Sequence, residues 1–225
     1  MKKRRVLTIA LALCLVAIMA FGSLAYFTQS KNISNKFMTA AYDPENPDKP
    51  VNPDDLFSIT VTEPDAVEAA KTDDDITTND DGGHTYKNLN PGQTVTKDPT
   101  VKNTGKYDQW VRVSVTVTKA AEWKAICAAN NITDLTAIFN DFDSSKWTLA
   151  EKKEDTTANT LTYTYYLNSK LAADQTATLF KSVTLPASLT AEQFASIAEF
   201  ELNVAADAIQ ADNNGTTAAA GFVNF

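Results

Sequence analysis

The sequence predicts a mainly β protein built from two packed antiparallel sheets, and three observations support this fold class. Apolar residues alternate strictly with polar ones in several segments, most cleanly from Val111 to Val117. Threonine fills many of the polar positions, which is typical of strands with one solvent-facing side. Helical spacing of apolar residues is confined to segments that interrupt the strands. Parallel sheets covered on both faces would instead give continuous apolar runs.

Residues 1–25 have the layout of a secretory signal peptide. Lys2 to Arg5 are all basic and precede an uncharged apolar run from Val6 to Phe21. Ser23 and Ala25 supply the small residues that a signal peptidase requires, so we expect cleavage after Ala25. The alternative is a retained membrane anchor, but the run is shorter than the roughly 20 residues that span a bilayer. We therefore expect an exported protein with no stable membrane anchor after cleavage.

Residues 26–42 are expected to form an extended N-terminal arm. The arm begins with Tyr26, and Phe27, Ile33 and Phe37 are separated by even numbers of residues. In a strand, such residues point to the same face. The arm is therefore a candidate strand with one apolar side.

Residues 43–56 are predicted to be an acidic spacer between the arm and the body. Prolines recur at every third position, which is the period of a polyproline II helix. Such a helix would give a semi-rigid spacer of roughly 28 Å. An ordinary solvated linker with chance proline spacing is the alternative. The prolines are Pro44, Pro47, Pro50 and Pro53.

The body, residues 57–225, contains five segments that are expected to be strands. In each segment apolar side chains occupy every second position, so one face is buried and the other is solvated. The inward residues are Phe57, Ile59 and Val61; Val111, Val113, Val115 and Val117; Leu161, Tyr163, Tyr165 and Leu167; Leu179, Val183 and Leu185; and Phe200, Leu202, Val204 and Ala206.

Helices are expected in two places in the body. An insertion at about residues 120–143 should hold two short helices, the first carrying the i, i+4 pair Trp123 and Cys127. Thr190 and Gln193 match a capping box, which predicts a helix that runs to about Ile197. The second helix of the insertion is indicated by the i, i+3, i+4, i+7 spacing of Leu135, Ile138, Phe139 and Phe142.

The charge balance argues against nucleic acid as a partner. The chain has 20 Lys and Arg residues against 28 Asp and Glu residues, a net charge of -8. Loss of the four basic leader residues would make the net charge -12. An acidic protein repels phosphate backbones and anionic membrane surfaces.

The residue types that commonly carry catalysis are scarce in this sequence, which argues against an enzyme. We expect no catalytic, cofactor-binding or metal-binding residues. The one histidine, His84, is expected in an exposed turn, and Cys127 is expected to be a small buried residue. No phosphate-binding glycine motif is present. The acidic loop Asp73 to Gly83 lacks the spacing of an EF-hand, so a solvated loop is favoured and calcium binding stays an alternative.

From Asn90 to Val117 the sequence is NPGQTVTKDPTVKNTGKYDQWVRVSVTV. This stretch and the N-terminus resemble the TasA/camelysin family of exported bacterial proteins that form biofilm matrix fibres. The shared features are a leader before the aromatic pair Tyr26 and Phe27, a P-G-[DQ]-x-V-x-K-[DP] stretch, and an N-T-G turn before an alternating strand. They cover about half of the chain. The matching body residues are Pro91, Gly92, Lys97, Asp98, Pro99, Asn103, Thr104, Gly105, Val111 and Val113.

The resemblance implies a jelly-roll-like sandwich, a dedicated signal peptidase, and an arm that inserts as a strand into the next subunit. Two features depart from the family: the proline-rich spacer, and the insertion from Trp123 to Phe142. The peptidase activity suggested by the name camelysin is not expected here, because no constellation of metal ligands is visible.

Two functions are therefore compared. The leading hypothesis is an exported structural protein of an extracellular matrix or bacterial cell surface, which self-associates into filaments by donating the strand with Tyr26, Phe27, Ile33 and Phe37. The alternative is a monomeric binding or adhesin-like module. In that case Trp110, Trp123 and Trp147 could stack on sugars, although core packing is favoured for them. An extracellular peptidase is the least favoured function.

Overall fold

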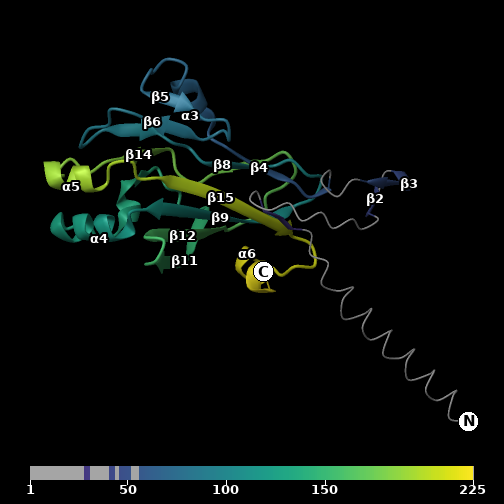
Figure 1. The fold of residues 1–225 in the computed structure, drawn as a ribbon. Helices are drawn as coiled ribbons and strands as arrows, with labels where there is room; N and C mark the ends of the chain where they lie inside the picture. The colour runs from purple at the N-terminus through teal and green to yellow at the C-terminus, as the bar shows by residue number, and fades with distance from the viewer. Residues whose placement is uncertain (1–27, 31–40, 44–45, 52–55, 225) are drawn as a thin grey trace, which may run out of the picture.

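The computed structural model describes residues 28–30, 41–43, 46–51 and 56–224, with side chains from Leu56 to Val223. The described chain is mainly β, with several antiparallel sheets and few helices (Figure 1). The mainly β part of the predicted fold is therefore confirmed. The predicted leader lies outside the described residues.

The largest sheet has five antiparallel strands in the order β1-β15-β9-β12-β11. The predicted strands around Val113, Tyr163 and Val204 are confirmed as β9, β12 and β15. On β9 and β12, the predicted inward side chains are at most 3% exposed, and the intervening polar residues are half-buried. The bounds are β1 (Thr28–Ser30), β9 (Gln109–Thr118), β11 (Trp147–Asp155), β12 (Thr160–Leu167) and β15 (Leu202–Gln210).

Two three-stranded sheets have the orders β10-β14-β7 and β13-β8-β4. A separate hairpin pairs β5 with β6. The predicted strand around Ile59 is confirmed as β4, and Val183 lies in β14. The bounds are β4 (Ile59–Thr62), β5 (Ile76–Thr78), β6 (His84–Tyr86), β7 (Thr94–Thr96), β8 (Thr100–Asn103), β10 (Phe139–Asn140), β13 (Thr176–Thr178) and β14 (Ser182–Thr184).

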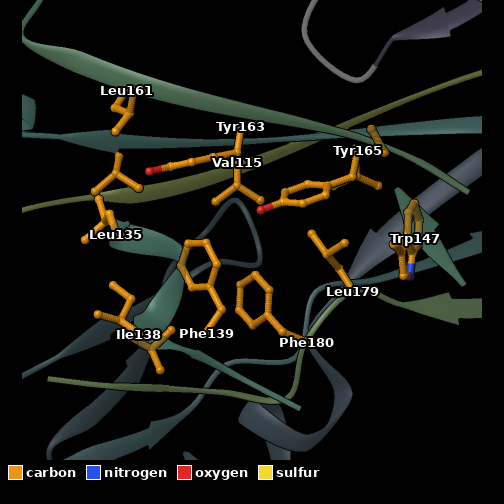
Figure 2. Packing of buried hydrophobic residues seen from close by; sticks show 14 of the residues in the cluster. Val115, Leu135, Ile138, Phe139, Trp147, Leu161, Tyr163, Tyr165, Leu179 and Phe180 are labelled. Carbon is orange, nitrogen blue, oxygen red and sulfur yellow. The ribbon is translucent and has the colours of Figure 1, made fainter. Parts of the chain in front are cut away.

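One cluster of buried apolar side chains joins the five-stranded sheet to both smaller sheets. Val115 of β9 belongs to the same cluster as Val101 of β8 and Val183 of β14. Figure 2 shows the centre of this cluster, where Phe139 and Phe180 stack in parallel with ring centroids 4.6 Å apart. These rings connect the segments around β10 and β14 to the inward face of β12.

The helices are short and lie at the margins of the sheets. They are α3 (Pro64–Ala69), α4 (Ala120–Ala129), α5 (Ala191–Ser196) and α6 (Ala218–Gly221), with 3₁₀ turns η1 (Leu135–Ile138) and η2 (Phe222–Asn224). The structure confirms α4 and the capping box of α5, in which Thr190 and Gln193 exchange both expected hydrogen bonds. In Figure 1, α4 and α5 lie side by side at one end of the molecule.

The second helix of the insertion, predicted from Leu135 to Phe142, is wrong. Only the single turn η1 forms, and Phe139 then enters strand β10 opposite Val183. The stack of Phe139 on Phe180 requires this extended backbone, so tertiary packing outweighs the helical spacing.

The described part of the proline-rich segment forms a hairpin. Strand β2 (Ala41–Asp43) pairs with β3 (Asn46–Val51), and Tyr42 lies opposite Pro50. The polyproline II conformation predicted for this segment is therefore wrong for residues 46–51. In a two-stranded ladder each strand has one unpaired side, so a residue without an N–H is tolerated.

Candidate functional site

The outer edge of β15 is where the N-terminal arm meets the body. The described part of the arm, β1, pairs antiparallel with the C-terminal half of β15, with Gln29 opposite Ala208. The other side of β15 is paired with β9 along its whole length. No described strand pairs with the outer side of β15 between Leu202 and Ala206. We call this stretch, Leu202–Ala206, the exposed edge, a name that refers only to pairing among the described strands.

An apolar strip runs beside the exposed edge. Ile59 and Val61 of β4, and Leu202 and Val204 of β15, pack against the main core but are only half-buried. The valines of the central strand β9, by contrast, are at most 1% exposed. These four side chains are therefore less buried than the valines of β9, and they form a continuous apolar strip along β4 and β15.

The opposite edge of the five-stranded sheet differs from the exposed edge. Strand β11 has a β-bulge between Leu149 and Glu151, and every residue from Glu151 to Asp155 is charged and exposed. Bulges and charges are features that prevent edge-to-edge pairing. The exposed edge has no charged residue and no irregularity in its register with β9. Of the two edges, β15 is therefore the one suited to pair with a further strand.

The N-T-G motif, Asn103 to Gly105, holds the first described residues of the body. Asn103 is fully buried. Its Nδ2 donates to the carbonyl oxygens of Tyr107 and Leu171, each at 2.8 Å. Its Oδ1 accepts from the Gly105 N–H at 2.9 Å and from Gln109 Nε2 at 2.5 Å. The amide thus satisfies four partners in a closed network.

Gly105 is needed because the chain before β4 passes directly over it. A Cβ at this position would lie 2.4 Å from the Leu56 carbonyl oxygen. The N–H groups of Thr104 and Gly105 both donate to the Ser58 carbonyl, at 2.9 and 3.1 Å. The motif therefore fixes the backbone from which the arm and the proline-rich segment extend.

The P-G and K-D residues of the second motif also have structural roles. Gly92 has a φ of +81°, and its N–H donates to the Leu185 carbonyl. Asp98 accepts from the Asp65 and Ala66 N–H groups, at 2.9 and 3.0 Å, and so caps α3. Burial raises the pKa of the Asp98 carboxyl, and these two hydrogen bonds oppose the increase. The motif joins α3 to the start of β8.

Lys97 belongs to a buried cluster that sequence reasoning did not find. Its Nζ donates to Glu63 Oε1 at 2.6 Å, and His84 Nδ1 lies 3.1 Å from the other oxygen of the same carboxylate. The His84 side chain is fully buried, so the prediction of an exposed turn is wrong. No local pattern signals this cluster, because its members come from three distant segments.

The predicted donor residues Tyr26, Phe27, Ile33 and Phe37, and the cleavage residues Ser23 and Ala25, lie outside the described residues. Of the predicted arm, only Thr28–Ser30 and the last residues, in β2, are described. The structure therefore brings the arm to β15 through backbone pairing, without describing the side chains that the sequence singled out.

The three tryptophans are core residues. Trp110, Trp123 and Trp147 are 1–3% exposed, so none offers a surface for sugar stacking. Trp147 Nε1 donates to the Thr178 carbonyl at 2.9 Å.

Cys127 is half-buried. Its burial, and to a smaller extent the nearby Asp134 carboxylate, raise the pKa of its thiol. A raised thiol pKa disfavours a nucleophilic role.

The acidic loop uses carboxylates to close its own turns. Asp73 accepts from the Asp75 N–H and Asp81 accepts from the Gly83 N–H, each at 2.9 Å. Over residues 56–224, no group of three histidine, cysteine or acidic side chains is arranged to hold a metal ion. Calcium binding by this loop has no support among these contacts.

Within the part of the chain that the structure describes, no helix has the length and apolar character to cross a membrane. No family model, no curated protein and no solved structure matches the chain. The function is therefore argued from the edge, the strip and the motifs described above.

Proposed function

We propose that this chain is an exported structural protein of a bacterial extracellular matrix, which polymerises by donating its N-terminal strand to the next subunit. The body would be a two-sheet, jelly-roll-like sandwich, and self-association into filaments would be its activity. The supporting observations are the pairing of the described part of the arm, β1, with β15, and the uncharged stretch Leu202–Ala206, on whose outer side no described strand pairs.

Pairing of β1 with its own chain is compatible with exchange between subunits. The described ladder joins three residues of β1 to β15, and each hydrogen bond contributes about 1 kcal/mol net. Detachment of these three residues therefore costs little compared with unfolding of the body. A neighbouring chain could offer the same strand in the same register, as in domain swapping. Head-to-tail contacts of this kind give filaments when they do not close into a ring.

The pairing of β1 with β15 of its own chain is also the observation that favours the second candidate function, a monomeric binding module. A monomeric surface module would keep β1 permanently on its own β15 and would use another face for binding. The two functions therefore differ in one measurable property: whether the strand beside β15 comes from the same chain or from another one.

A cysteine exchange experiment tests this difference. Gln29→Cys is made in one chain and Ala208→Cys in another, both with Cys127→Ser, because Gln29 and Ala208 lie directly opposite each other. Under strand donation, mixing the two chains under polymerising conditions gives a disulfide-linked heterodimer. The double variant Gln29→Cys, Ala208→Cys reports pairing within one chain.

The matched control combines Gln29→Cys with Lys153→Cys on the protected edge β11, and it should give no heterodimer. Deletion of residues 26–41 should abolish filaments in electron micrographs and leave the circular dichroism of a β body. Filaments that form without these residues, or a Gln29–Ala208 disulfide found only within single chains, would contradict the proposal.

A further inference from the structure

A hollow on the outward face of the five-stranded sheet is not used by the proposed function. It is an open depression with a volume of about 750 Å³. Arg112 and Ser114 of β9 and Thr164 and Tyr166 of β12 form its floor. Helix α6 packs against β9 and β12 (Figure 1) and contributes Ala219 to the lining. The remaining lining residues are Thr148, Ala150, Glu151 and Ala219.

Four of the eight residues that line the hollow carry a hydroxyl group. The Ser114 and Thr164 hydroxyls contact each other at 3.3 Å, and Thr148 Oγ1 donates to Asn168 Oδ1 at 2.7 Å. Each hydroxyl can donate once and accept twice, so these contacts leave further hydrogen-bonding capacity. Tyr166 adds an aromatic ring that is fixed by a parallel stack on Phe222, with centroids 5.7 Å apart.

The bulge in β11 places an acidic acceptor at the same site. Because Ala150 is the extra residue, Glu151 lies opposite Thr164 and so on the outward face of the sheet. Both Ala150 and Glu151 line the hollow. Bulges commonly redirect side chains next to binding sites.

The charges in the hollow disfavour an anionic ligand. Arg112 donates to Asp207 through Nε and Nη2, at 3.1 and 2.7 Å, and its guanidinium lies 4.7 Å from the centre of the Phe222 ring. This cation is therefore neutralised by a carboxylate from the adjacent strand. Glu151 adds a negative charge, and the whole chain carries a net charge of -8.

We propose that this hollow binds a neutral polysaccharide. Sugar hydroxyls would exchange hydrogen bonds with Ser114, Thr164 and Glu151, and a sugar ring would pack against Tyr166. Hydroxyl-rich walls, one aromatic ring and no unpaired cation suit a neutral polyhydroxylated chain. The site lies on the outward face of the sheet, so it operates whether or not β15 accepts a strand from another subunit.

Calorimetric titration of the full chain with neutral cello-, isomalto- and chito-oligosaccharides tests the proposal, with oligogalacturonate as the anionic comparison. At least one neutral series is expected to bind. The double variant Ser114→Ala, Thr164→Val should weaken that binding about tenfold. Glu151→Gln, a change at an exposed position, should also weaken binding of the oligosaccharide.

The matched control is Thr116→Val, Thr162→Val. These residues form the neighbouring hydroxyl pair on the same two strands, at 2.9 Å, but do not line the hollow. Their loss should leave the affinity unchanged. The proposal is overturned if no neutral oligosaccharide binds at millimolar concentration, if oligogalacturonate binds more tightly, or if the control variant loses as much affinity as the hollow variant.

Discussion

Asn103 connects the N-T-G motif to the start of the body through one buried amide. Its four hydrogen bonds reach Gly105, Tyr107, Gln109 and Leu171. Alanine at this position would leave these buried groups without partners, and each such group costs roughly 1–3 kcal/mol. The contacts of Asn103 therefore give the motif a structural role at the start of the body.

We predict that Asn103→Ala lowers the free energy of unfolding by about 3 kcal/mol or more, measured by urea denaturation. The exposed Asn203→Ala on β15 is the control, with an expected change within about 0.5 kcal/mol. Equal effects of the two substitutions would show that the buried network contributes nothing of its own.

Asp134 gives a prediction for pH dependence. Burial raises the pKa of its carboxyl, but hydrogen bonds from Lys152 and the Thr136 N–H lower it by more, so the net pKa is below the ordinary value. A carboxyl with a lowered folded-state pKa stabilises the fold above its unfolded-state pKa. That stabilisation is lost as the pH falls through the folded-state pKa.

We therefore predict that Asp134→Asn lowers the free energy of unfolding at neutral pH, and that the difference from the parent chain shrinks below about pH 4. Urea denaturation at a series of pH values measures this difference. Asp212→Asn, which removes a more exposed partner of Lys170, should have a smaller effect. A difference that is the same at pH 3 and pH 7 would argue against the assignment.

At the scale of elements, the strands with one clearly buried face were predictable. The alternating valines of β9 and the Leu-Tyr-Tyr-Leu pattern of β12 face the core as expected. Strand β11 was missed because it is an edge strand that is buried only at Trp147 and has no alternation of apolar and polar residues. Helix α3 was missed because it has only six residues and its cap, Asp98, comes from a distant part of the chain.

The capping box of α5 supports a prediction at this scale. Helix α5 has no buried residue, so its ends contribute a large share of its stability. Thr190→Ala should destabilise the helix by about 1 kcal/mol, visible as faster amide hydrogen exchange in Ala191–Ser196. Glu192→Ala, on the same helix but outside the capping box, is the control and should change exchange less.

At the scale of the whole molecule, the sequence predicted that the arm would enter a sheet edge of the next subunit, and it did not identify the acceptor edge. In the structure, the described part of the arm, β1, pairs with β15 of its own chain. The ladder between β1 and β15 joins the two ends of the chain, and no local pattern specifies such a pairing. The hollow was also beyond sequence reasoning, because a bulge and helix α6 shape it. Threonine at outward positions was visible in the sequence, but its grouping with Tyr166 was not.

Net charge supports a prediction about assembly. Chains with a net charge of -8, or -12 after the predicted cleavage, repel one another. Salt screens this repulsion, with a Debye length of about 10 Å at 0.1 M. Filament growth should therefore speed up between about 0.01 and 0.2 M NaCl, measured by light scattering with electron microscopy of the product. Growth that slows with salt would indicate that attraction between opposite charges drives assembly.

Strand β1 closes the longest loop in the described fold, because its partner β15 lies near the other end of the chain. Closing a long loop carries an entropic cost, and the three residue pairs of the described ladder offset only part of it. During refolding, β1 should therefore join the sheet after the other strands, and on gentle heating it should leave first. Under the proposed strand donation, release of β1 would free the C-terminal half of β15 for a strand from another subunit while the body stays folded.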